Sequence, residues 1–366
     1  MKFKSERDIL VEALAAASRV VATRLIGASS GILLNLSGNQ LTVTGTDLDI
    51  TVRTTVDVIG GEDGSMVVPA RLIVDAVRSL EAGAVTVSGS EENIEVSLGR
   101  AKFSLRTFAV MDYPKLPPIS GSVTNIAATD LINGLNQVVR AAANDDARPL
   151  LTGVLFTTEN DALRLIATDS YRLAVRDVPG VKGFGGHHDL LVPARALQEL
   201  QRAAASLGPD AEIGVTLNDS EICFIVGQTN ISSRLIDGNY PSVLQLIPAS
   251  YPNQLRIAKD TLLTSLKRAK LLAKDSTSSV RLTTKDKGLE IRTQSHDTGD
   301  IEDNVDADYS GEEITIAFNP SFLIDGIEAV PGDEIILEMS DSVRPAMVHG
   351  VEDTRFRYLL MPVRVQ

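Results

Sequence analysis

A domain-sized internal repeat is the feature that most constrains what this chain can fold into. The segment Val68–Leu72 (VPARL) returns as Val192–Leu197 (VPARAL), and an eroded copy stands at Phe318–Leu323 (FNPSFL). The copies are about 125 residues apart, whereas short solenoid repeats have periods of roughly 20 to 50 residues. The sequence therefore predicts three similar domains rather than a stacked array of short repeats.

Two further phrases keep the same spacing. Gly45–Asp49 (GTDLD) recurs as Ala167–Tyr171 (ATDSY), with a weaker third copy at Gln294–Asp297 (QSHD), and Asp112–Pro114 (DYP) matches Asn239–Pro241 (NYP). We interpret the recurring Thr-Asp pair as turn chemistry, because an aspartate side chain can accept hydrogen bonds from the backbone N–H groups that follow it. A pair of general acids is the alternative, but no partner base is identifiable.

Each copy combines helical and strand-like patterns. A first helix is expected where apolar residues recur at helical spacing, namely at Leu10, Leu14, Ala17 and Val21, at Leu131, Leu135, Val138 and Ala142, and at Leu262, Leu266, Ala269 and Ala273. A second helix is expected to begin at each proline-containing copy, since proline is tolerated in a first helical turn. Alternating segments such as Gln40–Thr44 and Ala84–Ser88 predict strands. The predicted fold class is α+β, with three similar domains that each pack two helices on antiparallel sheet.

Linkers rich in proline, glycine and serine separate the copies. They lie at Lys115–Asn125 and Pro248–Asn253, and such segments are typical of domain boundaries. The expected domains are residues 1–121, 126–249 and 254–366.

Composition is that of an ordinary globular protein. The single cysteine, Cys223, lies in an apolar run, which favours a small buried thiol and rules out a disulfide within one chain. The sequence shows neither a signal-peptide pattern nor an apolar run of membrane-spanning length, so a cytoplasmic protein without a membrane partner is expected. The net charge of −13 by itself disfavours binding to DNA phosphates.

The patterns that could carry chemistry are incomplete. Gly27–Gly31 (GASSG) spells a nucleophile elbow, but here a helix precedes it and strand-like residues follow, the reverse of what the elbow requires. Asp306–Ala317 begins like a calcium loop and ends in alanine where a bidentate glutamate is needed. His187 and His188 are adjacent rather than spaced as metal ligands. We therefore expect no catalytic residues, no metal and no cofactor.

Three longer stretches resemble a known family. ATDSYRLA at Ala167–Ala174, RLIDGNYP at Arg234–Pro241 and YLLMPVR at Tyr358–Arg364 are similar to signature stretches of the beta subunits of bacterial DNA polymerase III, the sliding clamps, and the resemblance covers the whole chain. It implies a DNA replication processivity factor rather than an enzyme. In that family a homodimer of three-domain protomers closes head to tail into a ring that encircles and slides on double-stranded DNA. Such a ring needs equivalent wall segments, which would explain the repeat.

A ring would also reconcile the acidic chain with DNA. Threaded DNA is retained without strong phosphate binding, so weak, sequence-independent contacts suffice and permit sliding. The predicted DNA-proximal residues are Arg24, Arg71, Arg78, Arg140, Arg148, Arg195, Arg202, Lys267, Arg268, Lys270 and Lys274. For each of them, a solvated helix face or an ion pair is the alternative. Asp325 and Glu328 make the last helix acidic, which departs from this expectation.

The resemblance further implies a peptide-binding pocket between the second and third domains. Its partners in the family are the replicative polymerase alpha subunit, the clamp loader, other polymerases and repair proteins. Carried over by motif, the pocket residues are Thr168, Ser170, Tyr171, Arg172, Leu173, Pro241, Leu246, Leu359, Leu360, Met361, Pro362, Val363 and Arg364, with Arg148, Leu151 and Gly153 at the rim. Their apolar side chains would accept weakly bound, exchangeable anchors. An ordinary domain-packing core is the alternative. The pair Ser170-Tyr171 and Gln245 depart from the family pattern, so the preferred motif stays open.

Leu271 and Leu272 match an apolar pair that the family places at the dimer interface, and adjacent helix residues do not face each other on one side of a helix. The edge strand around Lys102 to Thr107 is a candidate for the opposing surface. Two other classes stay open from the residues alone: an enzyme with a site between repeated domains, and a scaffold that binds peptides without encircling DNA. Turnover would indicate the first, and equal retention on circular and linear DNA the second.

Overall fold

The computed structural model describes residues 1–22, 26–90, 92–116, 121–145, 147–159, 162–181, 189–273, 279–295 and 299–364. Arg24 and Lys274, two predicted DNA-proximal residues, lie outside the described residues, as do His187 and His188.

Two α-helices lie in each third of the described chain, as the repeat predicts. They are α1 (Arg7–Val20) and α2 (Ala70–Arg78), α3 (Ala128–Val138) and α4 (Ala194–Ala203), and α5 (Lys259–Lys270) and α6 (Pro320–Ala329). The apolar periodicity marks their inner sides, because Leu10, Leu131 and Leu262 are all fully buried. At the start of α6, the Asn319 side chain accepts a hydrogen bond from the backbone N–H of Ser321 (2.9 Å), which satisfies a donor that a helix leaves unpaired at its first turn.

The other regular elements of each third are mainly antiparallel strands. The first third contains β1 (Lys2–Glu6), β2 (Gly31–Ser37), β3 (Gln40–Thr46), β4 (Ile50–Asp57), β5 (Ile59–Glu62), β6 (Gly64–Pro69), β7 (Ala84–Gly89), β8 (Asn93–Leu98) and β9 (Ala101–Arg106). The middle third contains β10 (Thr124–Ala127), β11 (Gly153–Glu159), β12 (Ala162–Thr168), β13 (Arg172–Val178), β14 (Asp189–Pro193), β15 (Glu212–Leu217), β16 (Glu221–Val226) and β17 (Thr229–Arg234). The last third contains β18 (Asn253–Ala258), β19 (Val280–Lys285), β20 (Gly288–Ser295), β21 (Gly299–Asp306), β22 (Asp308–Ser310), β23 (Thr315–Phe318), β24 (Glu334–Met339), β25 (Ala346–Gly350) and β26 (Phe356–Leu360).

Two compact units make up the structure, and their boundaries cut across the repeat. One consists of Met1–Thr129 and Arg195–Leu235, the other of Asp130–Ala194 and Ile236–Gln366. The first unit holds two sheets, of order β5-β1-β7-β8-β9 and β10-β15-β16-β17-β4-β3-β2-β6. The second holds sheets of order β14-β11-β12-β13-β26-β25-β24-β18-β22 and β21-β20-β19-β23. The units therefore follow the sheets rather than the repeats.

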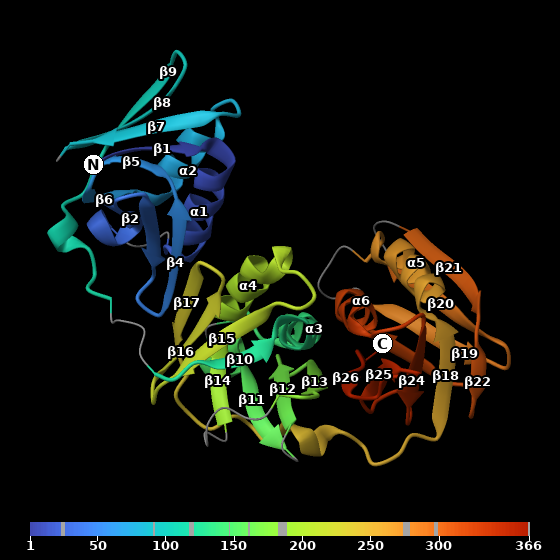
Figure 1. The fold of residues 1–366 in the computed structure, drawn as a ribbon. Coiled ribbons are helices and arrows are strands. Elements are labelled where there is room, and N and C mark those ends of the chain that lie inside the picture. The colour runs from blue at the N-terminus through green and yellow to red at the C-terminus, as the bar shows by residue number, and fades with distance from the viewer. Residues whose placement is uncertain are drawn as a thin grey trace. The chain divides into compact units, whose positions relative to one another are not determined.

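Each unit contains one junction at which strands from two different thirds pair. In the first unit β4 pairs with β17, which we call the first seam, and in the second unit β13 pairs with β26, which we call the second seam (Figure 1). Backbone hydrogen bonds thus run without interruption from one repeat into the next. A seam of this kind is as well satisfied as the interior of a sheet.

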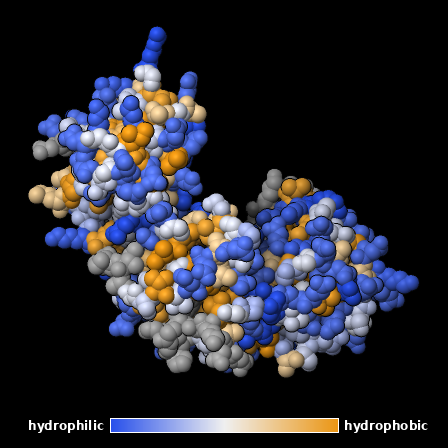
Figure 2. Space-filling view, viewed as in Figure 1, coloured by the Kyte–Doolittle hydropathy of each residue, from blue (hydrophilic) through white to orange (hydrophobic). Residues whose placement is uncertain are grey.

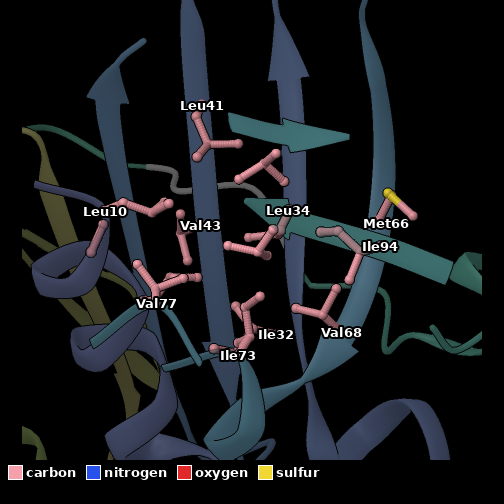
Figure 3. Close-up of a cluster of buried hydrophobic side chains, with 14 of the residues drawn as sticks. Leu10, Ile32, Leu34, Leu41, Val43, Met66, Val68, Ile73, Val77 and Ile94 are labelled. Atoms are coloured by element: carbon pink, nitrogen blue, oxygen red, sulfur yellow. The ribbon is translucent and has the colours of Figure 1, made fainter. Parts of the chain in front are cut away.

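The core of the first unit lies between its helices and its sheets. Leu10 of α1 and Val77 of α2 belong to this cluster together with Leu34 of β2 (Figure 3). Burying each such side chain contributes roughly 1.5–3 kcal/mol. Gly45 in β3 permits the helix to lie this close, because a Cβ atom there would stand 2.0 Å from the backbone oxygen of Ala17.

Candidate functional site

The predicted partner-binding residues gather around the second seam, within one compact unit. Leu173 of β13 lies opposite Leu359 of β26, and Arg172 lies opposite Leu360. Successive side chains of a strand point to opposite faces of the sheet. Leu173 and Leu359 therefore share one face of the seam, and Arg172 and Leu360 share the other.

A small apolar cluster forms on the face of Leu173 and Leu359. We call it the seam cluster; its buried members are Ile166, Leu173, Val175, Val243, Met347 and Leu359. Val243 begins a 3₁₀ helix, η6 (Val243–Leu246), in the segment that connects the middle and last thirds. That segment packs against the sheet through Val243, and Leu246 at its end is 53% exposed. The cluster itself is thus buried, and an exposed apolar residue follows it in the connecting segment.

A hydrogen-bonded turn precedes β13. The Thr168 hydroxyl donates to the Arg172 carbonyl (2.6 Å) and accepts from the Ser170 backbone N–H (3.1 Å). The Asp169 carboxylate accepts from the backbone N–H groups of Tyr171 (2.9 Å) and Arg172 (3.0 Å). These bonds hold Ser170 at φ 79°, a conformation that residues other than glycine seldom adopt.

The first third contains the same turn before β4. The Thr46 hydroxyl accepts from the Leu48 backbone N–H (3.0 Å), and the Asp47 carboxylate accepts from the Ile50 backbone N–H (2.7 Å). Leu48 has φ 81°, in the position that Ser170 occupies in the other copy. The interpretation of the Thr-Asp pair as turn chemistry is confirmed.

Arg172 lies on the opposite face of the second seam and is buried. Its guanidinium pairs with Asp169 (3.0 Å) and with Asp325 of α6 (2.6 Å), and it lies 4.3 Å from the centre of the Phe322 ring. The Tyr358 hydroxyl donates to the Phe322 carbonyl (2.9 Å) from the same side. Arg172 therefore supports the turn and α6 from beneath and contributes nothing to the exposed surface.

The exposed part of the site is formed by the turn and the C-terminal segment. The Met361 N–H donates to the Tyr171 carbonyl (2.9 Å), and the Val363 N–H donates to the Ala317 carbonyl (2.7 Å). Tyr171 is 59% exposed and Met361 41%. Leu246, Tyr171 and Met361 are thus exposed apolar side chains on segments next to the second seam, and the Tyr171 ring stacks on the Phe322 ring at 6.3 Å between ring centres. Other hydrophobic patches also lie among hydrophilic residues on the face drawn in Figure 2, so geometry rather than hydropathy singles this site out.

The other predicted pocket residues divide between rim and support. Arg148 donates from one guanidinium nitrogen to the Asp169 carbonyl (2.9 Å) and the Ser170 hydroxyl (3.1 Å), which fixes the turn from its outer side. Pro241, Gln245 and Arg364 are exposed, and Pro362 and Val363 are partly buried. Thr168, Leu151, Gly153 and Leu360 are buried beneath the surface.

Sequence reasoning missed several residues that build the site. Val243 and Met347 complete the seam cluster, while Phe322 and Asp325 hold Arg172. Asp325 stood out in the sequence as an acid on a helix expected to be basic, and the buried partner Arg172 now explains it. The other three carried no signal, because their contacts join segments that are distant in the chain.

Three basic helix residues in the first unit, Arg19, Arg195 and Arg202, are paired with acids. Arg195 of α4 pairs with Asp47 of the first turn (3.0 Å). The side chain of Glu199 is nearly buried. It forms an ion pair with Arg19 of α1 (2.8 Å) and another with Arg202. The ion-pair alternative therefore applies to Arg195 and Arg202.

The same holds in the second unit. Glu328 of α6 pairs with Lys267 of α5 (2.9 Å) and with Arg140 (3.0 Å). The hydrogen bond from Lys267, assisted by Arg140, lowers the pKa of Glu328 against the opposing effect of partial burial. The acidic character of α6 thus matches the basic residues that face it.

Other basic residues differ in their partners. Arg268 pairs with Asp303 of β21. Arg71, Arg78 and Lys270 are exposed and make no ion pair with any residue that the structure describes. Just after α5, Leu271 is 70% exposed.

Sites of other kinds were also considered. In the described part of the chain, no group of three or more His, Cys, Asp or Glu side chains is placed to hold a metal ion. None of the described helices has the length and apolar character that a membrane crossing requires. Cys223 is buried, as predicted.

Comparison with known proteins matches all three thirds of the chain to one family. Models of the N-terminal, central and C-terminal domains of the DNA polymerase III beta subunit match residues 1–117, 125–242 and 244–364. The beta sliding clamp of Streptomyces coelicolor is 31% identical over the full length of both chains, and that of Pseudomonas aeruginosa is 28% identical, also over both full lengths.

Solved structures show the same similarity. A sliding clamp from Bartonella birtlesii bound to griselimycin superposes with a TM-score of 0.91 at 28% identity, covering all of both chains. The beta sliding clamp of C. crescentus superposes with a TM-score of 0.90 at 26% identity, covering all of this chain and 99% of the other.

Proposed function

The chain belongs to the family of DNA polymerase III beta subunits, the beta sliding clamps, and from that premise we propose how it acts as a processivity factor. Two copies join head to tail into a closed ring that encircles double-stranded DNA in the cytoplasm. A polymerase is tethered to the ring through the apolar surface at the second seam. The observation that carries this proposal is the seam itself, which the chain makes twice.

Both seams have the same register. In the first, Ile50 lies opposite Ser233; in the second, Arg172, which follows the same Thr-Asp turn, lies opposite Leu360. In each seam, the strand that follows the Thr-Asp turn (β4 or β13) pairs with the last strand of the next repeat (β17 or β26). That last strand is the third in a run of three antiparallel strands. The strands that correspond in the rest of the chain are β21 and β9, and each is an edge of its described sheet. An edge strand is a template for pairing with another chain.

The two edges have opposite charge. β21 carries acids at Asp300, Glu302, Asp303 and Asp306, whereas β9 and its flank carry Arg100, Lys102 and Arg106. We apply the strand pairing of the two seams to these edges and use the residue pairs within the hairpins β20–β21 and β8–β9 to match positions. Glu302 then lies opposite Lys102 of a second copy, and Ile301 lies opposite Phe103. Leu271 and Leu272, which follow α5 on the same repeat as β21, belong to this interface in our proposal. Two such interfaces would close six domains, expected at residues 1–121, 126–249 and 254–366 of each copy, into a ring.

A charge reversal tests this interface. Glu302→Lys would set two lysines against each other at both interfaces of the ring, which costs about 1–2 kcal/mol in total. We expect the dimer of 39.2-kDa chains to dissociate five- to thirtyfold more readily, as measured by light scattering across concentrations. Adding Lys102→Glu should restore the wild-type dimer, and Glu312→Lys, an exposed reversal outside both edges, should change nothing. An unchanged dimer in Glu302→Lys would refute the register.

Duplex DNA inside such a ring needs only weak contacts. Arg140, Arg195, Arg202, Lys267 and Arg268 each have acidic partners, which would soften their attraction for phosphate and permit sliding. Arg71, Arg78 and Lys270 are the exposed cations that we propose approach DNA most directly, together with Arg24 and Lys274. Because retention is topological, the net charge of −13 is no obstacle.

The apolar surface at the second seam is the proposed tethering site. Tyr171, Leu246 and Met361 are exposed on segments next to the buried Leu173 and Leu359, and we propose that they accept a short peptide with two or three apolar anchors. At roughly 1.5–3 kcal/mol for each buried anchor, binding is weak enough for exchange. We propose the polymerase alpha subunit, the clamp loader, other polymerases and repair proteins as the alternating partners.

Griselimycin is a suitable probe for this surface, since it is bound in the Bartonella clamp structure. We expect it to bind the wild-type chain and Leu246→Asp to lower its affinity at least tenfold, because a carboxylate at the rim must be desolvated against apolar atoms. Leu72→Asp is the matched control, since Leu72 is 51% exposed on α2 and Leu246 is 53% exposed. Calorimetry would measure both. Equal affinities for the wild type and Leu246→Asp would reject the assignment.

A further inference from the structure

A second cleft lies at the first seam, on the strands that correspond to the proposed tethering site. It has a volume of about 290 Å³, and Thr51 and Arg53 of β4 line it together with Asn230 and Ser232 of β17. Leu48 of the Thr-Asp turn stands at its edge. The cleft lies entirely within one compact unit. Its size admits two or three side chains rather than a large cofactor.

The strand registers match this cleft to the seam cluster residue by residue. Leu173 pairs with Leu359, which pairs with Met347; Thr51 pairs with Ser232, which pairs with Cys223. The matched positions, second seam first, are Leu173 and Thr51, Val175 and Arg53, Met347 and Cys223, and Leu359 and Ser232. Leu173, Val175 and Leu359 are thus matched by polar side chains, and Met347 is matched by the buried thiol of Cys223. The first seam therefore has the same strand arrangement as the second seam but different side chains at the matched positions.

Arg53 makes the cleft suited to a negatively charged ligand. Its side chain is partly buried in the cleft and makes no ion pair or hydrogen bond with any residue that the structure describes. Burial raises the pKa of the neighbouring Cys223 thiol, and the positive charge of Arg53 is among the influences that oppose this rise. A partly desolvated guanidinium without a partner is costly. It is therefore poised to accept an anionic ligand, and guanidinium geometry suits a carboxylate.

The surrounding charges limit that ligand to a single negative charge. Lys115 and Arg234 also line the cleft, but Asp49 and Glu221 offset them. Arg234 and Asp49 approach within 3.9 Å of each other and are both largely exposed. One uncompensated cation remains. A multiply charged phosphate would be repelled by the two carboxylates, whereas one carboxylate is matched.

Leu48 adds an apolar contact at the edge. It is 52% exposed and is held at φ 81° by the Thr46 and Asp47 hydrogen bonds. Leucine seldom adopts this backbone conformation, and strain of this kind is concentrated at functional sites. Leu116 lines the same cleft from another segment. The cleft therefore combines one uncompensated positive charge with two leucines.

We propose that this cleft is a second docking site, which binds an extended peptide segment of a partner protein carrying an aspartate or glutamate next to an apolar residue. The carboxylate pairs with Arg53, the apolar side chain rests on Leu48 and Leu116, and the amide of Asn230 and hydroxyl of Ser232 bond the peptide backbone. Each protomer then offers two docking surfaces with different preferences. This site goes beyond the proposed tethering function and does not depend on it.

The test uses acetyl-Leu-Asp-amide as the probe and acetyl-Leu-Asn-amide as its uncharged match. Ligand-observed NMR titration of the full-length wild-type protein should show the aspartyl peptide binding at least fivefold more tightly, in the millimolar range. Inorganic phosphate should not displace it at equal concentration. Indistinguishable affinities, no detectable binding of either peptide, or displacement by phosphate would each overturn the proposal.

Variants locate the site. Arg53→Gln should lose the fivefold preference, Arg53→Lys should retain most of it, and Ser232→Leu should block binding by filling the cleft. Arg344→Gln, at an exposed arginine in the loop before β25, is the control. Thermal unfolding would verify that each variant folds.

Griselimycin should neither compete with the peptide nor lose affinity in Arg53→Gln. A failure of the proposed second docking site can therefore be told apart from a failure of the tethering site. An aspartyl preference that survives Arg53→Gln, or competition by griselimycin, would place the peptide elsewhere.

Discussion

Charged side chains next to the second seam are fixed by hydrogen bonds that depend on their ionisation. Asp353, just before β26, accepts from Arg176 of β13 (2.8 Å) and from Arg355 (2.8 Å). The Arg355 hydrogen bonds hold the pKa of Asp353 well below its usual range, against the opposing effect of burial and with support from Arg176. A carboxylate whose pKa is lowered by folding stabilises the fold above its unfolded pKa, and this contribution is lost as pH falls toward the folded value.

Asp353→Asn should therefore lower the free energy of unfolding of the second unit at pH 7, by about 1–2 kcal/mol. The difference from wild type should shrink steadily below about pH 4. Urea denaturation followed at pH 7 and pH 3 measures both, and the exposed neighbour Glu352 supplies the control in Glu352→Gln. A loss of stability that is the same at both pH values would show that the ionised carboxylate is not responsible.

Packing between elements depends on one close approach of α6 to the second seam. A Cβ atom at Gly326 would stand 2.3 Å from the Tyr358 ring of β26. Gly326→Ala must displace that ring or the helix, which costs about 1–3 kcal/mol. The loss should appear as a lower thermal midpoint of the second unit. Gly208→Ala, where the added methyl group meets open space, should be nearly neutral, and equal midpoints for the two variants would contradict this account.

The sequence predicted elements better than the contacts between them. Each first helix carries its own apolar period and each second helix its own proline signal, so α1 to α6 could be placed from local residues. The seams could not be read in this way, because Thr54 and Thr229 meet across 175 positions of chain. Arg172 was predicted as a pocket residue because it lies in a family motif, and that prediction stands. Its burial follows from strand alternation and from Asp325, which only the folded chain brings near.

At the scale of the whole molecule, the two seams and the two edge strands have one physical meaning. The chain makes the same strand pairing twice. It also presents two edge strands of opposite charge, β21 and β9, and these are suited to pairing with a second copy. The resulting grip on DNA would come from enclosure, so the acidic protein needs no strong phosphate contacts. Retention should therefore depend on whether the DNA has ends.

The most direct measurement follows the protein on one DNA molecule before and after that DNA is cut. The protein is loaded by a bacterial clamp loader onto nicked circular DNA, separated from free protein by gel filtration at moderate salt, and half of the sample is then linearised with a restriction enzyme. We predict that it stays on the circle and leaves the linear DNA within minutes by sliding off the ends. Equal retention on both forms, or equal loss from both, would contradict the ring.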